Sequence, residues 1–332
     1  MTLPLFTEQS PPRWEDAILE ANDFLCMPIP EKRTFLEPWV QEQSIILITG
    51  WRGTGKTWFA LFALDAITRG VALGPWKCTQ SAPCLYLDGE MAAIDVQNRL
   101  KATGISESKP AGLYIYSDAW ASQLNLPRAS LLNPEWRDGM KEILLKKEIK
   151  LWVIDNIAAL TPGIDENSKQ EWDPISRWLL DLRFAGISTL LLHHEGKKNE
   201  QRGTSAREDV LDISISLQKP PDYKTEDGAR FIVRFTKHRI ASNYLPLIAD
   251  TEFQVDTTSG RATYTCKYIK KDNRLEVLKM FNVGKRAKEI AETLKITPGY
   301  VSQIKSKAEK DGFLSKEGKL TPQGREKYGS ED

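Results

Sequence analysis

Residues 44–57 read Ser-Ile-Ile-Leu-Ile-Thr-Gly-Trp-Arg-Gly-Thr-Gly-Lys-Thr, and this stretch decides the fold. The first six residues, 44–49, form an apolar run typical of a buried strand. The next eight have the spacing Gly-x-x-x-x-Gly-Lys-Thr, and a helix is expected directly afterwards, at Trp58–Arg69. Because a strand, this loop and a helix in that order are the setting in which the loop wraps phosphate groups, we predict a nucleotide site here.

Each residue type in the loop suits a phosphate. Gly50, Gly53 and Gly55 let backbone N–H groups curve around the oxygens, and Lys56 adds a point charge for the β- and γ-phosphates. The Thr57 hydroxyl is a ligand for Mg²⁺. ATP and Mg²⁺ are therefore the expected cofactors. The predicted nucleotide-binding residues are Gly50, Trp51, Arg52, Gly53, Thr54, Gly55, Lys56, Thr57 and Trp58.

Two acidic positions complete the predicted site. Leu151-Trp-Val-Ile-Asp155 is an apolar strand ending in a carboxylate, which at the strand end is placed to hold Mg²⁺. Glu90 follows the strand that begins at Cys84, and a carboxylate there is suited to orient and deprotonate the attacking water. Asp88 competes for that role, and the ordinary alternative for Glu90 is an acid at a helix start.

Further apolar runs flanked by helical patterns indicate an α/β fold with a mostly parallel central sheet. The expected strands after the first are Cys84–Leu87, Leu113–Tyr116, Leu151–Ile154 and Ile187–Leu192. The expected helices between them are Ile94–Thr103, Asn133–Lys147 and Glu171–Phe184. Antiparallel strands at Ile213–Gln218, Arg230–Phe235 and Thr251–Val255 are predicted to extend the sheet.

The composition of the chain argues against several classes of protein. The 332 residues carry 46 Lys/Arg and 45 Asp/Glu, so nucleic-acid binding must come from local patches. The four cysteines show no C-x-x-C pair, which argues against a zinc site and fits a reducing cytoplasm. No run of 18 apolar residues occurs, and the first residues lack the pattern of a signal peptide. We expect a cytoplasmic protein without a membrane partner.

The C-terminal segment differs from the rest. Residues 270–332 hold 15 Lys/Arg and 10 Asp/Glu. Helices are expected at Arg274–Asn282, Ala287–Leu294 and Tyr300–Lys310, and a small wing around residues 313–320. The stretch 287–305 resembles a helix-turn-helix, in which Tyr300, Gln303, Lys305 and Lys307 face DNA. A helical module for protein contacts is the alternative.

The order of the loop 50–57, Glu90 and Asp155 resembles the RecA/DnaB superfamily of P-loop ATPases, and most of all the RepA-like hexameric helicase ATPases of plasmids and mobile elements. The resemblance covers about residues 30–260 and implies a RecA-like core and a homo-oligomer, with hexamers known in the family. It departs from DnaB in lacking room for the primase-binding domain before residue 40.

The resemblance also assigns roles to residues further along. His194, at a strand end, corresponds to a γ-phosphate sensor. The loop after it corresponds to a contact for single-stranded DNA, through Lys197, Lys198, Arg202 and Ser205. Lys237 and Arg239 resemble the Lys-x-Arg element that enters a neighbour's ATP site, with Arg207 as the rival arginine. An ordinary basic loop and a solvated basic strand end are the respective alternatives.

These observations predict an arm or linker at 1–40, a RecA-like ATPase domain at 41–266 and a small helix-turn-helix domain, all-α or winged-helix-like, at 267–332. The resemblance implies an oligomeric, DNA-associated ATPase motor, a helicase or replication ATPase of plasmid, phage or mobile-element type. The alternative is a RecA- or KaiC-like ATP switch that binds DNA through its C-terminal segment. A small-molecule kinase is disfavoured because no acceptor-binding lid is apparent.

Overall fold

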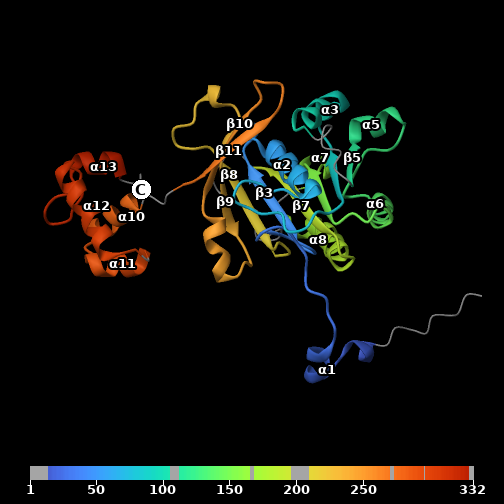
Figure 1. Cartoon of the computed structure of the whole chain (residues 1–332), viewed down its shortest axis with the longest axis horizontal. Coiled ribbons are helices and arrows are strands. Elements are labelled where there is room, and N and C mark those ends of the chain that lie inside the picture. The colour runs from blue at the N-terminus through green and yellow to red at the C-terminus, as the bar shows by residue number, and fades with distance from the viewer. Residues whose placement is uncertain are drawn as a thin grey trace, which may run out of the picture.

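A computed structural model describes residues 14–104, 112–164, 168–195, 209–269, 273–294 and 296–328. Its centre is a nine-stranded sheet with helices on both faces (Figure 1). The strands lie in the order β11 (Thr263–Tyr268), β10 (Thr251–Asp256), β9 (Arg230–Lys237), β8 (Ile213–Gln218), β3 (Ile45–Gly50), β7 (Ser188–His194), β6 (Leu151–Asp155), β4 (Cys84–Asp88) and β5 (Leu113–Ser117).

The six strands from β8 to β5 are parallel, and β9, β10 and β11 continue the sheet in antiparallel fashion. The predicted α/β class is confirmed. One detail of the prediction is wrong: β8 pairs in parallel with β3, so the antiparallel part begins at β9. Strand β11 was not predicted, because its side chains are mostly exposed and give no apolar pattern.

Because the central strands are parallel, all of them end at one edge of the sheet, the carboxyl edge, and begin at the other, the amino edge. The carboxyl edge carries the residues that end the strands, with Gly50 beside His194 and Asp88 beside Asp155. The amino edge carries the strand starts. Residue Gln41 lies there, since its carbonyl accepts a hydrogen bond of 2.9 Å from Ser188 Oγ at the start of β7.

Two apolar cores cover the two faces of the sheet. Helix α2 (Lys56–Arg69) lies in the first, with the hairpin of β1 (Thr34–Leu36) and β2 (Val40–Gln41). Helices α6 (Pro134–Lys146) and α8 (Lys169–Phe184) cover the second, where Trp152, Trp172 and Trp178 are buried. Shorter helices are α3 (Ala93–Ala102), α5 (Asp118–Gln123) and α7 (Ile157–Leu160), with single 3₁₀ turns at Thr225–Asp227 and Ser242–Ile248.

The C-terminal residues 273–328 form α10 (Arg274–Asn282), α11 (Ala287–Leu294), α12 (Pro298–Lys310) and α13 (Pro322–Tyr328), with a bridge between Leu314 and Leu320. They share a separate apolar core that includes Ile290, Val301 and Ile304. Helix α12 begins at Pro298, two residues before the expected start, and Thr297 Oγ1 caps it by accepting the N–H of Tyr300. Helix α13 was not predicted.

At the other end of the chain, a 3₁₀ turn (Trp14–Ala17) and α1 (Ala21–Cys26) stand clear of the sheet (Figure 1). Every residue from 14 to 32 is exposed. Among the residues described, no helix has the length and apolar character to cross a membrane.

Candidate active site at the carboxyl edge of the sheet

The loop between β3 and α2 has a backbone that requires glycine at Gly53 and Gly55, whose φ angles are +74° and +111°. At Gly55 space is also short, because a Cβ would lie 2.7 Å from a ring carbon of Phe231 on β9. The Thr54 hydroxyl donates to the carbonyl of Trp51 at 2.8 Å and fixes the turn. Helix α2 begins at Lys56, so its first N–H groups point at the space that this loop encircles.

Lys56 is buried in the loop it follows. Its Nζ donates to the carbonyl oxygens of Gly50 and Trp51 at 2.7 and 2.9 Å. Burial lowers the pKa of Lys56 from 10.5 to about 8, while Asp155, Glu195 and Glu90 partly restore it. The ammonium is therefore charged at neutral pH but only partly solvated, which favours an anion such as a phosphate as its partner.

Thr57 and Asp155 come together at the end of β6. The Thr57 hydroxyl donates to Asp155 Oδ2 at 2.7 Å, and the Tyr86 hydroxyl donates to the same oxygen at 2.8 Å. Burial raises the pKa of Asp155, a tendency that the hydrogen bonds from Thr57 and Tyr86 oppose. A hydroxyl and a carboxylate this close form an all-oxygen pair of the kind that binds Mg²⁺ next to a phosphate, so the residues present fit the metal. Tyr86, which the sequence analysis did not single out, supports this pair from β4.

The two candidates for the base have different surroundings. Asp88 is buried, and its Oδ1 accepts the backbone N–H groups of Glu90 and Met91 at 3.2 and 2.7 Å. Burial raises the pKa of Asp88 to about 6. Asp88 therefore fixes the turn after β4. Glu90 has a half-exposed side chain whose carboxylate lies 3.8 Å from His194 Nε2 and is free to meet a water molecule.

His194, at the end of β7, lies between the acidic residues of the site. Its Nε2 is 3.1 Å from the Asn156 side-chain amide, in addition to its contact with Glu90. Burial lowers the pKa of His194, and the nearby Lys56 adds to the effect. The imidazole is therefore neutral at pH 7. Asn156 was missed by sequence reasoning, although an Asn directly after an apolar strand is a recognisable helix cap, and its Oδ1 does accept the N–H of Ala159.

Glu195 is a second residue that the sequence analysis missed. Its Oε1 accepts hydrogen bonds from Thr49 Oγ1 on β3 at 2.7 Å and from Ser216 Oγ on β8 at 3.2 Å. The carboxylate thus ties together the ends of β3, β7 and β8. No sequence motif identifies Glu195, because its two partners are distant in sequence and become neighbours only through the order of the strands.

Lys237 and Arg239 do not meet this site within one chain. Strand β9 runs antiparallel to β8, and Lys237 pairs with Ser214 near the start of β8. Arg239 Nη1 lies 3.5 Å from Asp212 Oδ1, just before β8, and its side chain is 61% exposed. Both residues are therefore at the amino edge, opposite the loop 50–57. The predicted Arg207 and the DNA-loop residues Lys197, Lys198, Arg202 and Ser205 lie outside the described residues.

The predicted recognition helix α12 presents most of its candidate residues to solvent. Tyr300, Gln303 and Lys307 are exposed. Lys305 is less available, because its Nζ lies 3.7 Å from Glu309 Oε1 and 5.3 Å from the centre of the Phe281 ring. Trp58 is engaged in packing as well: its ring stacks near Phe62, and Arg99 lies over it.

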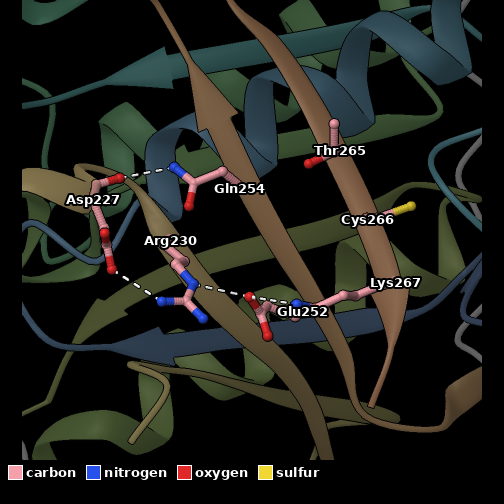
Figure 2. A pocket seen from close by; sticks show the side chains of 7 residues that line it. All are labelled: Asp227, Arg230, Glu252, Gln254, Thr265, Cys266 and Lys267. Atoms are coloured by element: carbon pink, nitrogen blue, oxygen red, sulfur yellow. Dashed lines mark hydrogen bonds and ion pairs between the residues drawn. The ribbon is translucent and has the colours of Figure 1, made fainter. Parts of the chain in front are cut away.

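A separate polar hollow of about 380 Å³ lies on β9, β10 and β11 (Figure 2). Arg230 crosses it and donates to Glu252, Asp227 and Asp222 at 2.9, 3.0 and 3.0 Å, and these hydrogen bonds raise the pKa of Arg230. Lys267 lies 3.4 Å from Glu252. Since these charges satisfy one another, the cluster is best explained as a clamp across the antiparallel strands.

Comparison with solved structures finds related folds at low sequence identity. One is a KaiC-like protein from Pyrococcus horikoshii OT3, with 16% identity, a TM-score of 0.47, and coverage of 70% of this chain and 93% of that one. Another is the flagellar accessory protein FlaH from Methanocaldococcus jannaschii, with 12% identity, a TM-score of 0.47, and coverage of 69% and 91%. No curated protein sequence matches the chain.

A family comparison matches residues 8–200, more than half of the chain, to the AAA domain. The matched range contains the loop 50–57, Glu90, Asp155 and His194, which are the residues that the structure gathers at the carboxyl edge. The RecA-like sheet, the phosphate-binding loop and this match agree, and the chain belongs to the AAA domain family of P-loop ATPases.

Proposed function

We propose that the protein is an oligomeric, DNA-associated ATPase motor of the RepA/DnaB-like kind, in which ATP is hydrolysed between two copies. The observation that carries the proposal is the separation of two half-sites on one sheet. The loop 50–57 lies at the carboxyl edge, and Lys237 and Arg239 lie at the amino edge with Arg239 largely exposed. Head-to-tail stacking of copies joins these edges, and an arginine then stabilises the charge that spreads over the γ-phosphate.

The residues at the carboxyl edge have distinct tasks in this reaction. The N–H groups of the loop and Lys56 hold the phosphates. Thr57 and Asp155 would hold Mg²⁺, which would supply positive charge against that of the phosphates. Glu90 orients the attacking water and accepts its proton. His194, neutral at pH 7, contacts the γ-phosphate, with Asn156 fixing its ring. Glu195 keeps the end of β7 in place.

Two parts of the chain are the proposed DNA contacts. The basic residues Lys197, Lys198 and Arg202, together with Ser205, lie in the segment that follows His194 in the sequence. Loss of the γ-phosphate at His194 would then change how this segment binds single-stranded DNA. The C-terminal residues 267–332 form the proposed second domain, and their separate core supports this division. Exposed Tyr300, Gln303 and Lys307 on α12 are its proposed contacts to duplex DNA, with Lys305 turned towards Glu309.

A second candidate function is an ATP switch that binds DNA without moving along it. It uses the same nucleotide site and the same separate C-terminal core as the motor, and it differs from the motor in needing no movement along DNA. In that case ATP drives assembly and is hydrolysed slowly.

The decisive measurement is steady-state ATP hydrolysis with and without single-stranded DNA, by the full chain and by Lys56→Ala. The motor proposal expects strong stimulation by DNA that disappears in Lys56→Ala. Hydrolysis that is indifferent to DNA, together with ATP-dependent assembly, would replace the motor by the switch.

A further inference from the structure

The N-terminal arm, residues 14–29, is an apolar surface without a partner in the described chain. Seven large apolar side chains in it are exposed: Trp14, Ile18, Leu19, Phe24, Leu25, Met27 and Ile29. Trp14, Ile18 and Leu25 are each exposed by almost 80%. Apolar groups gathered this densely on the surface of a soluble protein generally mark a contact site, and the arm is too short to bury them against itself.

A second apolar surface lies on the body of the same chain, where α3, β5 and α5 meet. We call it the edge patch, and it consists of Ile94, Trp120, Leu124 and Leu126, each more than half exposed. Helix α5 starts directly after Ser117, the residue of β5 that pairs with Asp88, so the patch lies at the carboxyl edge of the sheet. Figure 1 shows α3 and α5 next to each other above β5.

The arm leaves the body at the opposite edge. Its root is held by an ion pair of Arg33 with Glu42 at 2.5 Å, and by the pairing of Thr34 with Gln41, whose carbonyl accepts from Ser188 at the amino edge. Arg239 lies at this amino edge too. A copy that offers Arg239 to the loop 50–57 of its neighbour therefore brings its own arm to the edge at which the neighbour's patch lies.

The arm is acidic, and the segment that holds most of the edge patch carries little charge. Residues 14–26 contain Glu15, Asp16, Glu20 and Asp23 and no Lys or Arg, whereas residues 119–134, which hold most of the edge patch, contain Arg128 and no acidic residue. Arg128 is 74% exposed, although it also pairs with Asp118 at 2.8 Å. An acidic apolar arm therefore meets no carboxylate repulsion from this segment.

We infer that the arm of one copy, residues 14–29, docks on the edge patch of a second copy of the chain. This inference rests on the head-to-tail arrangement of the proposed function. It adds an apolar contact outside the nucleotide site, so that neighbouring copies stay joined while ATP and product exchange.

Cross-linking between two different chains tests the contact directly. Cys26 in the arm is exposed, and both chains carry Cys78→Ser and Cys266→Ser to remove the other accessible thiols. The first chain keeps Cys26 and carries a purification tag. The second has Cys26→Ser and Leu124→Cys, so a short bismaleimide can join the two only across copies. We expect a cross-linked heterodimer in the mixture, and its absence in the mixture overturns the inference.

Two controls distinguish the proposed contact from contact within one chain and from non-specific cross-linking. A single chain with both Cys26 and Leu124→Cys that cross-links only within itself shows that the arm folds back on its own body, which also overturns the inference. A second chain with Val283→Cys instead of Leu124→Cys should give no heterodimer, because Val283 is exposed on the C-terminal segment, away from the patch.

Assembly measured by analytical ultracentrifugation gives an independent readout. Phe24→Ser with Leu25→Ser should weaken self-association by about 100-fold or more, given the apolar area lost, and Val283→Ser should leave it unchanged. If the wild type assembles and the arm variant assembles equally well, the arm inference alone is wrong. If the wild type stays monomeric with ATP and with DNA, both the arm inference and the proposed intersubunit ATPase are wrong.

Discussion

Glu90 and Asp88 lie two residues apart, and their surroundings give them different tasks. Glu90 is half-exposed beside His194, while Asp88 Oδ1 accepts hydrogen bonds from two backbone N–H groups. We expect Glu90→Gln to lower kcat by about 10²–10⁴-fold, as for loss of a general base, with little change in ATP affinity. Asp88→Asn, which keeps an oxygen acceptor for the turn, should lower kcat far less. Equal losses in the two variants would contradict this division of roles.

Lys56 gives the site a pH dependence whose direction follows from its lowered pKa, about 8. Phosphates bind the ammonium, so ATP binding above pH 8 requires uptake of a proton. We expect the Kd for ATP to be flat below pH 8 and to rise above it, approaching about tenfold per pH unit. In Lys56→Arg the guanidinium stays charged, and any binding that remains should be flat up to pH 9.5. Fluorescent-nucleotide titrations measure both profiles, and a flat wild-type curve contradicts the assignment.

The same group affects folding in the opposite direction. The folded protein releases the Lys56 proton near pH 8, whereas the unfolded chain holds it up to its ordinary value of 10.5. Between these values the unfolded state binds more protons, so Lys56 makes the free energy of unfolding rise with pH. The site thus gains stability in the range where it loses affinity for phosphate, as expected for a buried charge kept for binding.

At the scale of elements, the junction of β3, α2 and β9 is where the loop is most sensitive. Gly53 and Gly55 both have positive φ, but only at Gly55 does an added Cβ meet another strand, at Phe231. We expect Gly55→Ala to destabilise the fold by about 2–4 kcal/mol through strain and overlap together, and to abolish ATP binding. Gly53→Ala carries the backbone strain alone and should cost about 1–2 kcal/mol. Denaturant unfolding of the two variants compares the costs.

The elements also show what the sequence could and could not predict. The loop 50–57, Asp155 and the buried parallel strands were predictable, because each depends on a local apolar run or a fixed spacing. Glu195 and Tyr86 were not, since their partners are brought together by strand order. Asn156 was recognisable as a helix cap, but its contact with His194 was not predictable. Strand β11 was missed because it is an exposed edge strand held by pairing with β10. Long-range pairing is the information that local patterns lack.

For the whole molecule, the two proposed half-sites at opposite edges predict that single-site variants rescue one another. Lys56→Ala keeps Arg239 but cannot bind phosphate. Arg239→Ala keeps the loop 50–57 but cannot supply an arginine to the nucleotide site of its neighbour. Each alone should lose activity by about 10³-fold or more. In an equal mixture, about one quarter of the interfaces pair an intact loop with an intact arginine, so about a quarter of wild-type ATPase should return.

Three comparisons make this mixing experiment specific. Arg234→Ala, on the same strand as Lys237 and paired with Asp250 at 2.6 Å, should stay active, which would show that losing an arginine near the end of β9 is not by itself enough to lose activity. Lys56→Ala mixed with the double variant Lys56→Ala, Arg239→Ala should remain inactive, because no intact loop is present. If the first mixture gives only the sum of its parents while sedimentation shows mixed oligomers, Arg239 does not act across the interface. The arginine of the site must then come from another position, with Arg207 the next to substitute.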